Sequence, residues 1–380
     1  MKKFLLGTSA LIAAGLAGGG AHAADPIKVS IEGYVSWVMA FGNQTNVSSF
    51  AGTGDRFDQI KWDGEIQFKG RTQLDNGLRV GFVVELEAFT TGAGGDQIDK
   101  HYVWFEDSWG RVELGAVAGA ANQLHVFIPA ATPGGGVDTP DYFHFATPGF
   151  SNAVLWSTAG SDNADIGDAN KIVYFSPKFG GFRFGVSYTP EFAPGTNGNV
   201  CAATGGSSTS FGVCTKNNFG EWQHAVEGAI RYEAEFNSVT IAASVGGFWA
   251  DAEVKGGVLK DYSRLAAGLS FSFSGFTVGG AFRWSNQGLQ GDNDQIMYGL
   301  GVTYTDGGAW TFGIAASQTR DKDGPFDTDK LSLIDGGAVY NLGPGVDLFA
   351  GAQWAKYSGA PFFAQSSSGL KGYVGTKLTF

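Results

Sequence analysis

Apolar and polar residues alternate along this chain over long stretches, most clearly in residues 61–74. One side carries Trp62, Gly64, Ile66, Phe68, Gly70, Thr72 and Leu74, and the other carries Lys61, Asp63, Glu65, Gln67, Lys69, Arg71 and Gln73. A period of two residues predicts a β-strand. The polar positions cannot all face a dry core, since each buried charge would need a partner. We therefore expect the polar side to face water and the apolar side a different environment.

The predicted strands are long and regularly punctuated. The alternation from Ile27 to Phe41 exceeds the five or six residues of an average strand and suits a tilted membrane strand of about nine to eleven. Seven short turns follow one another along the chain, at residues 75–77, 107–110, 180–181, 237–238, 274–275, 306–308 and 343–345. Eight longer polar connections alternate with them, at residues 42–55, 91–97, 118–150, 190–220, 251–261, 286–294, 321–329 and 357–368.

This punctuation predicts an all-β fold, a 16-stranded antiparallel transmembrane β-barrel. Sixteen strands leave an aqueous channel rather than a packed interior. In one strand, between Leu331 and Leu342, the parity of the apolar residues changes near residues 335–337, which predicts a β-bulge at that place.

Composition and charge argue against a nucleic-acid-binding protein and against a helical membrane protein. Residues 1–23 combine Lys2 and Lys3, an apolar segment and the sequence Ala21-His22-Ala23, which predicts a cleaved signal peptide and a barrel formed by residues 24–380. Removing the two lysines takes the formal charge from −11 to −13, and a chain so acidic is a poor partner for nucleic acid. No stretch after the signal has 18 consecutive apolar residues, so strands rather than helices would cross a membrane.

The third long connection, Ala118 to Phe150, contains no Lys or Arg. It carries His125, Asp138, Asp141 and His144, and its length is typical of a functional loop. We expect it to fold into the barrel and narrow it, with Asp138 and Asp141 as the acidic residues of the pore constriction. The alternative is that the two aspartates stabilise their own turn around Thr139-Pro140. The lumen parity of the early strands supplies five basic candidates for the opposite wall: Lys61, Lys69, Arg71, Arg79 and Arg111.

Two blocks carry a family resemblance. Tyr174 to Pro190 reads YFSPKFGGFRFGVSYTP, and the chain ends in GYVGTKLTF at Phe380. These blocks resemble the general, non-specific porins of alphaproteobacteria. The resemblance implies a 16-stranded barrel, usually a homotrimer, whose third long loop folds inward as a constriction. It also implies that basic residues of the early strands, Lys69 and Arg71 above all, face acid across the opening, and that the barrel assembly machinery recognises Phe380.

Three acidic or cysteine-containing connections suggest further chemistry. Cys201 and Cys214 lie in the connection 190–220, which is long for the family, and in an exported protein they predict a disulfide. Oxygen ligands for Ca²⁺ are present in two connections, although neither matches an EF-hand and solvated acidic loops are the simpler interpretation. The residues concerned are Asp162, Asp165 and Asp168, and Asp321, Asp323, Asp327 and Asp329.

The prediction for function is a general diffusion porin of the Gram-negative outer membrane that passes small hydrophilic solutes and ions. It needs no catalytic residue, metal or other cofactor, and its partners would be two further copies of itself, outer-membrane lipid and lipopolysaccharide. A substrate-selective channel for a sugar or an anion is the first alternative. A barrel enzyme is the second, although no nucleophile motif surrounds His125 or His144. The net charge favours mild cation selectivity.

Overall fold

The computed structural model describes residues 25–46, 56–89, 98–138, 142–145, 158, 169–192, 221–254, 256–257, 259–291, 293–322, 328–359 and 366–380. Its strands are β1 (Lys28–Gln44), β2 (Asp58–Gln73), β3 (Arg79–Glu87), β4 (Ile98–Asp107), β5 (Gly110–Ala116), β6 (Asn170–Phe175), β7 (Phe182–Phe192), β8 (Trp222–Phe236), β9 (Val239–Ala252), β10 (Tyr262–Phe273), β11 (Phe276–Ser285), β12 (Gln295–Thr305), β13 (Trp310–Lys322), β14 (Thr328–Gly343), β15 (Val346–Ser358) and β16 (Ser367–Thr379). One short helix, α3 (Ala120–Gln123), lies between β5 and β6.

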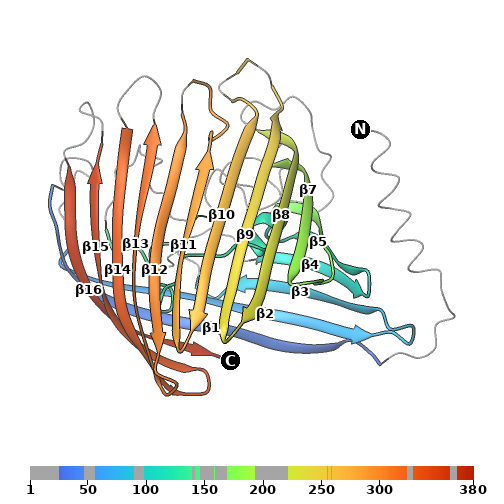
Figure 1. Cartoon of the computed structure of the whole chain (residues 1–380), viewed down its shortest axis with the longest axis horizontal. Helices are drawn as coiled ribbons and strands as arrows, with labels where there is room; N and C mark the ends of the chain where they lie inside the picture. The colour runs from blue at the N-terminus through green and yellow to red at the C-terminus, as the bar shows by residue number, and fades with distance from the viewer. Residues whose placement is uncertain are drawn as a thin grey trace.

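Each strand pairs antiparallel with its neighbours in sequence, and β1 also pairs with β16, so the sheet closes into a barrel. The last residue takes part in the closure, because Phe380 and Gly33 exchange two backbone hydrogen bonds of 3.0 Å. In Figure 1, β1 and β2 cross the row of strands β9 to β16 at a large angle, as expected of opposite walls with tilted strands. The predicted 16-stranded antiparallel barrel is confirmed.

The two faces of the wall follow the alternation of the sequence. In β2, Ile60 and Trp62 are 55% and 49% exposed and face outward, whereas Lys61 between them points inward to a backbone oxygen of the β5–β6 connection. Exposed apolar side chains recur at the same parity around the barrel, for example Leu265 and Leu269 in β10. An outer surface of this kind is stable only against lipid or another apolar surface.

Short turns join the strands at one end of the barrel. Asn237 and Ser238 have φ angles of 48° and 66°, and Ser274 and Gly275 have 47° and 84°. Positive φ at both central residues is the hairpin geometry whose twist matches that of the flanking strands. The strand ends that the longer connections join all lie at the opposite end, because consecutive strands are antiparallel.

Two details differ from the sequence prediction. Residues 335–337 of β14 pair in regular register with both neighbours, and the irregularity lies instead between Asn341 and Gly343. The parity changes because Leu331 and Leu333 point inward, where they pack against the β5–β6 connection. That connection is also longer than the predicted 118–150, since β5 ends at Ala116 and β6 begins at Asn170. Within the described residues, no helix is long and apolar enough to cross a membrane.

Candidate functional site

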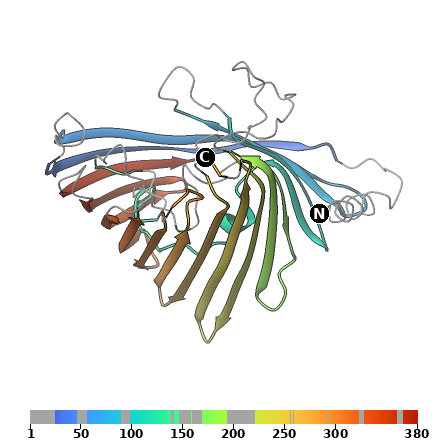
Figure 2. The same ribbon diagram turned by 90° about the horizontal axis from the view of Figure 1, so that it is seen from above.

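The described part of the β5–β6 connection, residues 117–138 and 142–145, lies against the inner side of the barrel wall; we call it the inner segment. Arg231 of β8 donates to the carbonyl oxygen of His125 at 3.1 Å, and the backbone nitrogen of Val126 donates to Ser244 Oγ of β9 at 2.8 Å. Both side chains occupy inward-facing positions. In Figure 2 the teal inner segment lies between the blue strands β1 and β2 and the yellow and orange strands of the opposite wall.

Inward-facing glycines allow the inner segment to approach the wall so closely. A Cβ atom at Gly268 of β10 would lie 1.9 Å from the carbonyl oxygen of Val126, and one at Gly301 of β12 would lie 2.3 Å from that of Pro129. No residue with a side chain fits at such a distance. Other inward glycines of the strands that face residues 121–132 of the segment at 3.2 Å or less are Gly185, Gly246, Gly279, Gly299, Gly313 and Gly337. We call this set of eight the glycine track, and it runs from β7 to β14.

A buried ion pair holds the start of the inner segment. The carboxylate of Glu227 in β8 accepts hydrogen bonds from Arg264 of β10 at 3.0 Å and from Ser187 of β7 at 2.6 Å. Ser187 Oγ in turn accepts from the backbone nitrogen of Ala120 at 3.3 Å. Gly119 rests on the same carboxylate, because a Cβ there would lie 1.4 Å from Glu227 Oε2. The entry to α3 is thus fixed by polar groups from three strands.

A second polar network anchors the far part of the inner segment. Tyr373 of β16 shares a hydrogen bond of 2.9 Å with Thr132 and donates to Asp335 of β14 at 3.1 Å. Gln353 of β15 accepts from the backbone nitrogen of His144 at 3.3 Å. Since these partners come from three strands and are buried, the network ties the segment to the wall opposite its entry.

Asp138 is part of the inner segment's interior. It is 7% exposed, and its oxygens accept from the backbone nitrogens of Ile128 at 3.1 Å and Thr158 at 2.7 Å. Burial raises the pKa of Asp138, and the hydrogen bonds from Thr158 oppose that rise. The expectation that Asp138 supplies open acid to the lumen does not fit these contacts; the carboxylate joins parts of the connection to one another. Asp141 lies outside the described residues.

Both histidines of the inner segment are buried. His125 Nε2 shares a hydrogen bond of 2.8 Å with Thr158 Oγ1, and burial, together with the charge of Arg264, lowers its pKa to about 4. Burial and the charge of Lys61 lower the pKa of His144 to about 3. Both imidazoles are therefore neutral at neutral pH, and neither is open to a solute.

The five predicted basic residues divide into two groups. Lys61 donates to the carbonyl oxygen of Phe143 and so contacts the inner segment directly. The others lie nearer the short turns. Lys69 pairs with Glu32 at 2.9 Å, Arg79 with Glu106 at 2.8 Å, Arg111 with Glu113 at 2.6 Å, and Arg71 lines a cavity together with Lys28 and Asp75. The structure therefore brings Lys61 to the segment and pairs Lys69, Arg79 and Arg111 with strand carboxylates.

Sequence reasoning assigned no contact with the third long connection to the basic residues that lie under the inner segment. Lys171 of β6 donates to the carbonyl oxygens of Val117 and Ala169, and Arg283 of β11 donates to Gln295. Lys371 of β16 is fully buried and donates to the carbonyl oxygen of Arg56 at 3.4 Å. Their inward parity is visible in the sequence, but their cover by a distant connection is not.

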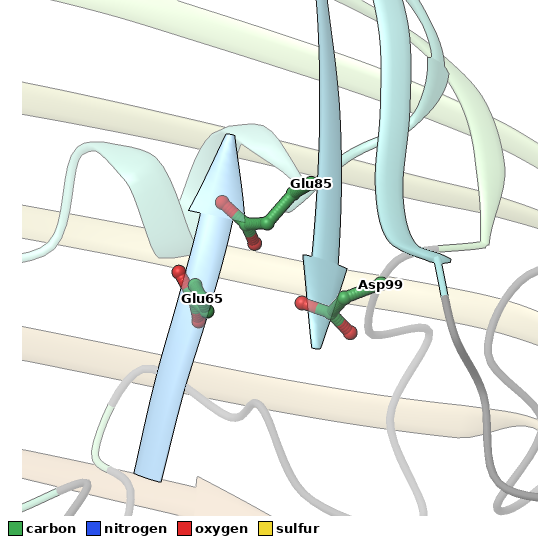
Figure 3. Close-up of side chains that lie close together, drawn as sticks. All are labelled: Glu65, Glu85 and Asp99. Atoms are coloured by element: carbon green, nitrogen blue, oxygen red, sulfur yellow. The ribbon is translucent and has the colours of Figure 1, made fainter. Parts of the chain in front are cut away.

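Carboxylates gather on the strands β2 to β4. Figure 3 shows Glu65, Glu85 and Asp99, whose oxygens lie within 4.8 Å of one another. A register shift at Glu85 accommodates Asp99 as an extra residue in β4. Lys100 donates to Glu85 and, at 2.9 Å, to Asp99. Three carboxylates could hold a divalent cation, but here the Lys100 ammonium already supplies the positive charge.

Two further sets of acidic residues bear on cation binding. Glu191, Glu221 and Glu253 bring their carboxylates within 4.8 Å of one another at the end with the long connections. Of the aspartates considered for Ca²⁺, Asp321 and Asp329 are cross-strand neighbours, and Asp321 accepts a hydrogen bond from Gln287. Residues 162, 165, 168, 323 and 327 lie outside the described residues, as do Cys201 and Cys214, so the calcium and disulfide predictions stay predictions.

Comparison with known proteins gives consistent results. A sequence model of Gram-negative porins matches residues 8–360. An uncharacterized protein of Rickettsia bellii is 25% identical over 45% of this chain, a match that covers 43% of that protein, and one of Rickettsia felis is 23% identical over the whole of both chains. The chain thus spans less than half of the first of these relatives.

Solved structures of similar fold include an anion-selective porin from Comamonas acidovorans, with a TM-score of 0.63 and 21% identity over 93% of this chain and 100% of that one. OmpF of Salmonella typhi has a TM-score of 0.62 with 12% identity over 94% of this chain and 100% of that one. Identities this low establish similarity of fold alone.

Proposed function

The chain belongs to the Gram-negative porin family, and on that premise we propose that it is a general diffusion channel for small hydrophilic solutes and ions. Members of this family form channels in the outer membrane, which agrees with the exposed apolar outer face of the barrel. The observation that carries the proposal is the inner segment, which lines one side of a 16-stranded barrel while polar strand faces line the other. A lumen of this width with a polar wall admits water.

The inner segment would set the narrowest part of this channel. It is anchored at both ends, by Glu227 at its start and by Tyr373 and Gln353 farther on, and it lies against the glycine track between them. A lining held in this way has a fixed thickness, so solutes would be separated by size. The exclusion limit would then depend on the space between the inner segment and the strands β2 to β4.

Reconstitution tests this proposal. Purified protein added to a planar lipid bilayer should produce discrete, nearly ohmic conductance steps, and liposomes that contain it should swell in uncharged sugars at rates that fall smoothly with sugar size. Saturation of the flux by one sugar would instead support a substrate-selective channel. Absence of steps and of swelling, with protein that migrates as a folded barrel, would contradict a channel of either kind.

The partners follow from the same proposal. One structural neighbour is a trimer form of OmpT from Vibrio cholerae, and a homotrimer of the present chain would produce conductance steps in groups of three. Outer-membrane lipid and lipopolysaccharide would cover the rest of the outer face. Phe380 completes the pairing with β1, and its recognition by the barrel assembly machinery predicts that deleting it lowers the amount of barrel in the outer membrane.

A barrel enzyme has less support. The family and the fold are those of channels. The histidines of the inner segment are buried, and His125 shares its hydrogen bond with Thr158, which is itself fully buried. A nucleophile and base must be reached by the substrate, and this pair is covered by protein.

A further inference from the structure

Four basic side chains of the covered wall, β6 to β16, have their donors turned toward protein. Arg264 is 4% exposed and is neutralised by Glu227, and Arg283 is 1% exposed and donates to Gln295. Lys371 is 0% exposed. Arg231, at the edge of the segment, donates to the carbonyl oxygen of His125. An anion could replace these acceptors only if the inner segment left the wall, so these bases offer little to an anion in the lumen.

The open wall, β2 to β4, differs in that it presents a group of carboxylates to the lumen. Four bases also occupy inward positions of β2 and β3, namely Lys61, Lys69, Arg71 and Arg79. Lys61 is bound to the inner segment, and Lys69 and Arg79 are paired with the carboxylates of Glu32 and Glu106. Five carboxylates point inward there, from Asp63 and Glu65 of β2, Glu85 and Glu87 of β3, and Asp99 of β4. The carboxylate oxygens of Glu65, Glu85 and Asp99 lie within 4.8 Å of one another, and Glu87 is the cross-strand neighbour of Glu65. We call these four residues and Asp63 the acidic wall. Lys100 compensates one of them. Glu65 and Glu87 stay partly exposed.

These two observations are independent, since one concerns cover by the inner segment and the other concerns the carboxylates of β2 to β4. Together they reverse the arrangement expected from the resemblance, in which acid lies on the inward loop and base on the wall. A narrow passage lined by protein weakens dielectric screening, so a fixed charge at its wall changes the local concentration of ions severalfold.

We infer that the acidic wall makes this channel prefer small cations, inorganic or organic, over anions, and that Glu65 and Glu87 determine this selectivity. The inference rests on the proposed channel function and adds the class of solute to it. Cations would be concentrated beside β2 to β4, whereas anions would find most bases of the opposite wall already bound to protein. The preference would grow as salt is lowered, because the Debye length rises from about 3 Å at 1 M to about 30 Å at 0.01 M.

The test is the reversal potential across a bilayer with a tenfold KCl gradient. The wild-type channel should be more permeable to K⁺ than to Cl⁻, and the double variant E65Q/E87Q should lower the permeability ratio by roughly threefold or more at low salt. Lys100→Gln should raise the ratio, since it uncovers Glu85 and Asp99. The control is Glu235→Gln, which removes a carboxylate near the short turn that follows β8 and should leave the ratio nearly unchanged.

The possible results separate the two proposals. A wild-type channel that prefers Cl⁻, or an E65Q/E87Q channel with normal conductance and an unchanged ratio, overturns the inference and leaves the channel function standing. An equal fall of the ratio in E235Q also overturns it, because the selectivity would then not belong to the acidic wall. Absence of any conductance step would contradict the channel function itself.

Discussion

The covered wall and the open wall of this barrel are built by the same strand alternation but differ in what their inward positions carry. On the covered wall these positions hold glycines such as Gly268, apolar residues such as Leu331 and Leu333, and bases bound to protein. On the open wall these positions hold the five carboxylates of the acidic wall, of which Glu65 and Glu87 are partly exposed. The difference shows that an inward-facing strand position is not necessarily exposed to solvent. A segment distant in sequence decides which half of the lumen meets water.

The largest expected effect comes from breaking the buried ion pair of the covered wall. Glu227→Gln leaves the Arg264 guanidinium buried without its counter-charge, which should destabilise the protein by about 3–5 kcal/mol. Heating in detergent, followed by electrophoresis of folded and unfolded forms, measures this as a lower transition temperature. Glu235→Gln, at an exposed position of the same strand, is the control. Equal transition temperatures for E227Q and wild type would mean that the pair does not hold the segment.

The next effect concerns the glycine track. Gly268→Ala places a Cβ where the Val126 carbonyl oxygen lies, and a backbone oxygen cannot rotate aside, so the segment should be displaced at a cost of about 3 kcal/mol. The expected readout is a noisier channel of altered conductance. Gly228→Ala, where a Cβ meets nothing within 4 Å, should behave as wild type. A quiet G268A channel of normal conductance would show that the segment need not touch this wall.

A lower pH should weaken the docking of the inner segment on the covered wall, with a smaller effect on stability than the two substitutions above. The pKa of His125 falls from an ordinary 6.5 to about 4 on folding, so the neutral imidazole is favoured when the segment is docked. Docking is then strongest above pH 6.5 and weakens as pH falls toward 4, by about 2 kcal/mol at pH 5. The raised pKa of Asp138 acts in the opposite sense and offsets part of this loss.

Limited proteolysis of the reconstituted channel between pH 7 and pH 4 measures this effect, with cleavage within residues 117–145 expected to rise as pH falls. His125→Gln, which keeps a polar side chain without a titrating group, should flatten the profile. A cleavage rate that is the same from pH 7 to pH 4 would contradict the assignment.

The smallest effect is expected for Lys69, the residue that the family resemblance favoured. Its pair with Glu32 is exposed to solvent, so Lys69→Gln should change stability and conductance very little. Urea-dependent unfolding and single-channel recording check both. A large loss of ion selectivity in K69Q would mean that a base of the open wall helps to determine selectivity, and the proposed difference between the two walls would be wrong.

Much of the fold could be predicted because the relevant signals are local. The strict alternation in residues 61–74, with short turns on one side and long connections on the other, was enough to predict sixteen strands and to identify the third long connection as the unusual one. The bulge expected at residues 335–337 was wrong for an instructive reason. Leu331 and Leu333 resemble outward residues in sequence, and they face inward because the inner segment covers them.

The sequence by itself determined the strand count, the closure of an all-β sheet and the parity of most wall positions, because a β-strand turns successive side chains to opposite faces whatever lies beyond them. Only the tertiary structure decided which inward positions are dry, that Asp138 is buried and that Lys69 lies away from the segment while Lys61 touches it. These properties depend on contacts between residues far apart in the sequence, such as Lys61 with Phe143 or Val126 with Ser244, and no local pattern specifies which distant backbone will lie against a given wall.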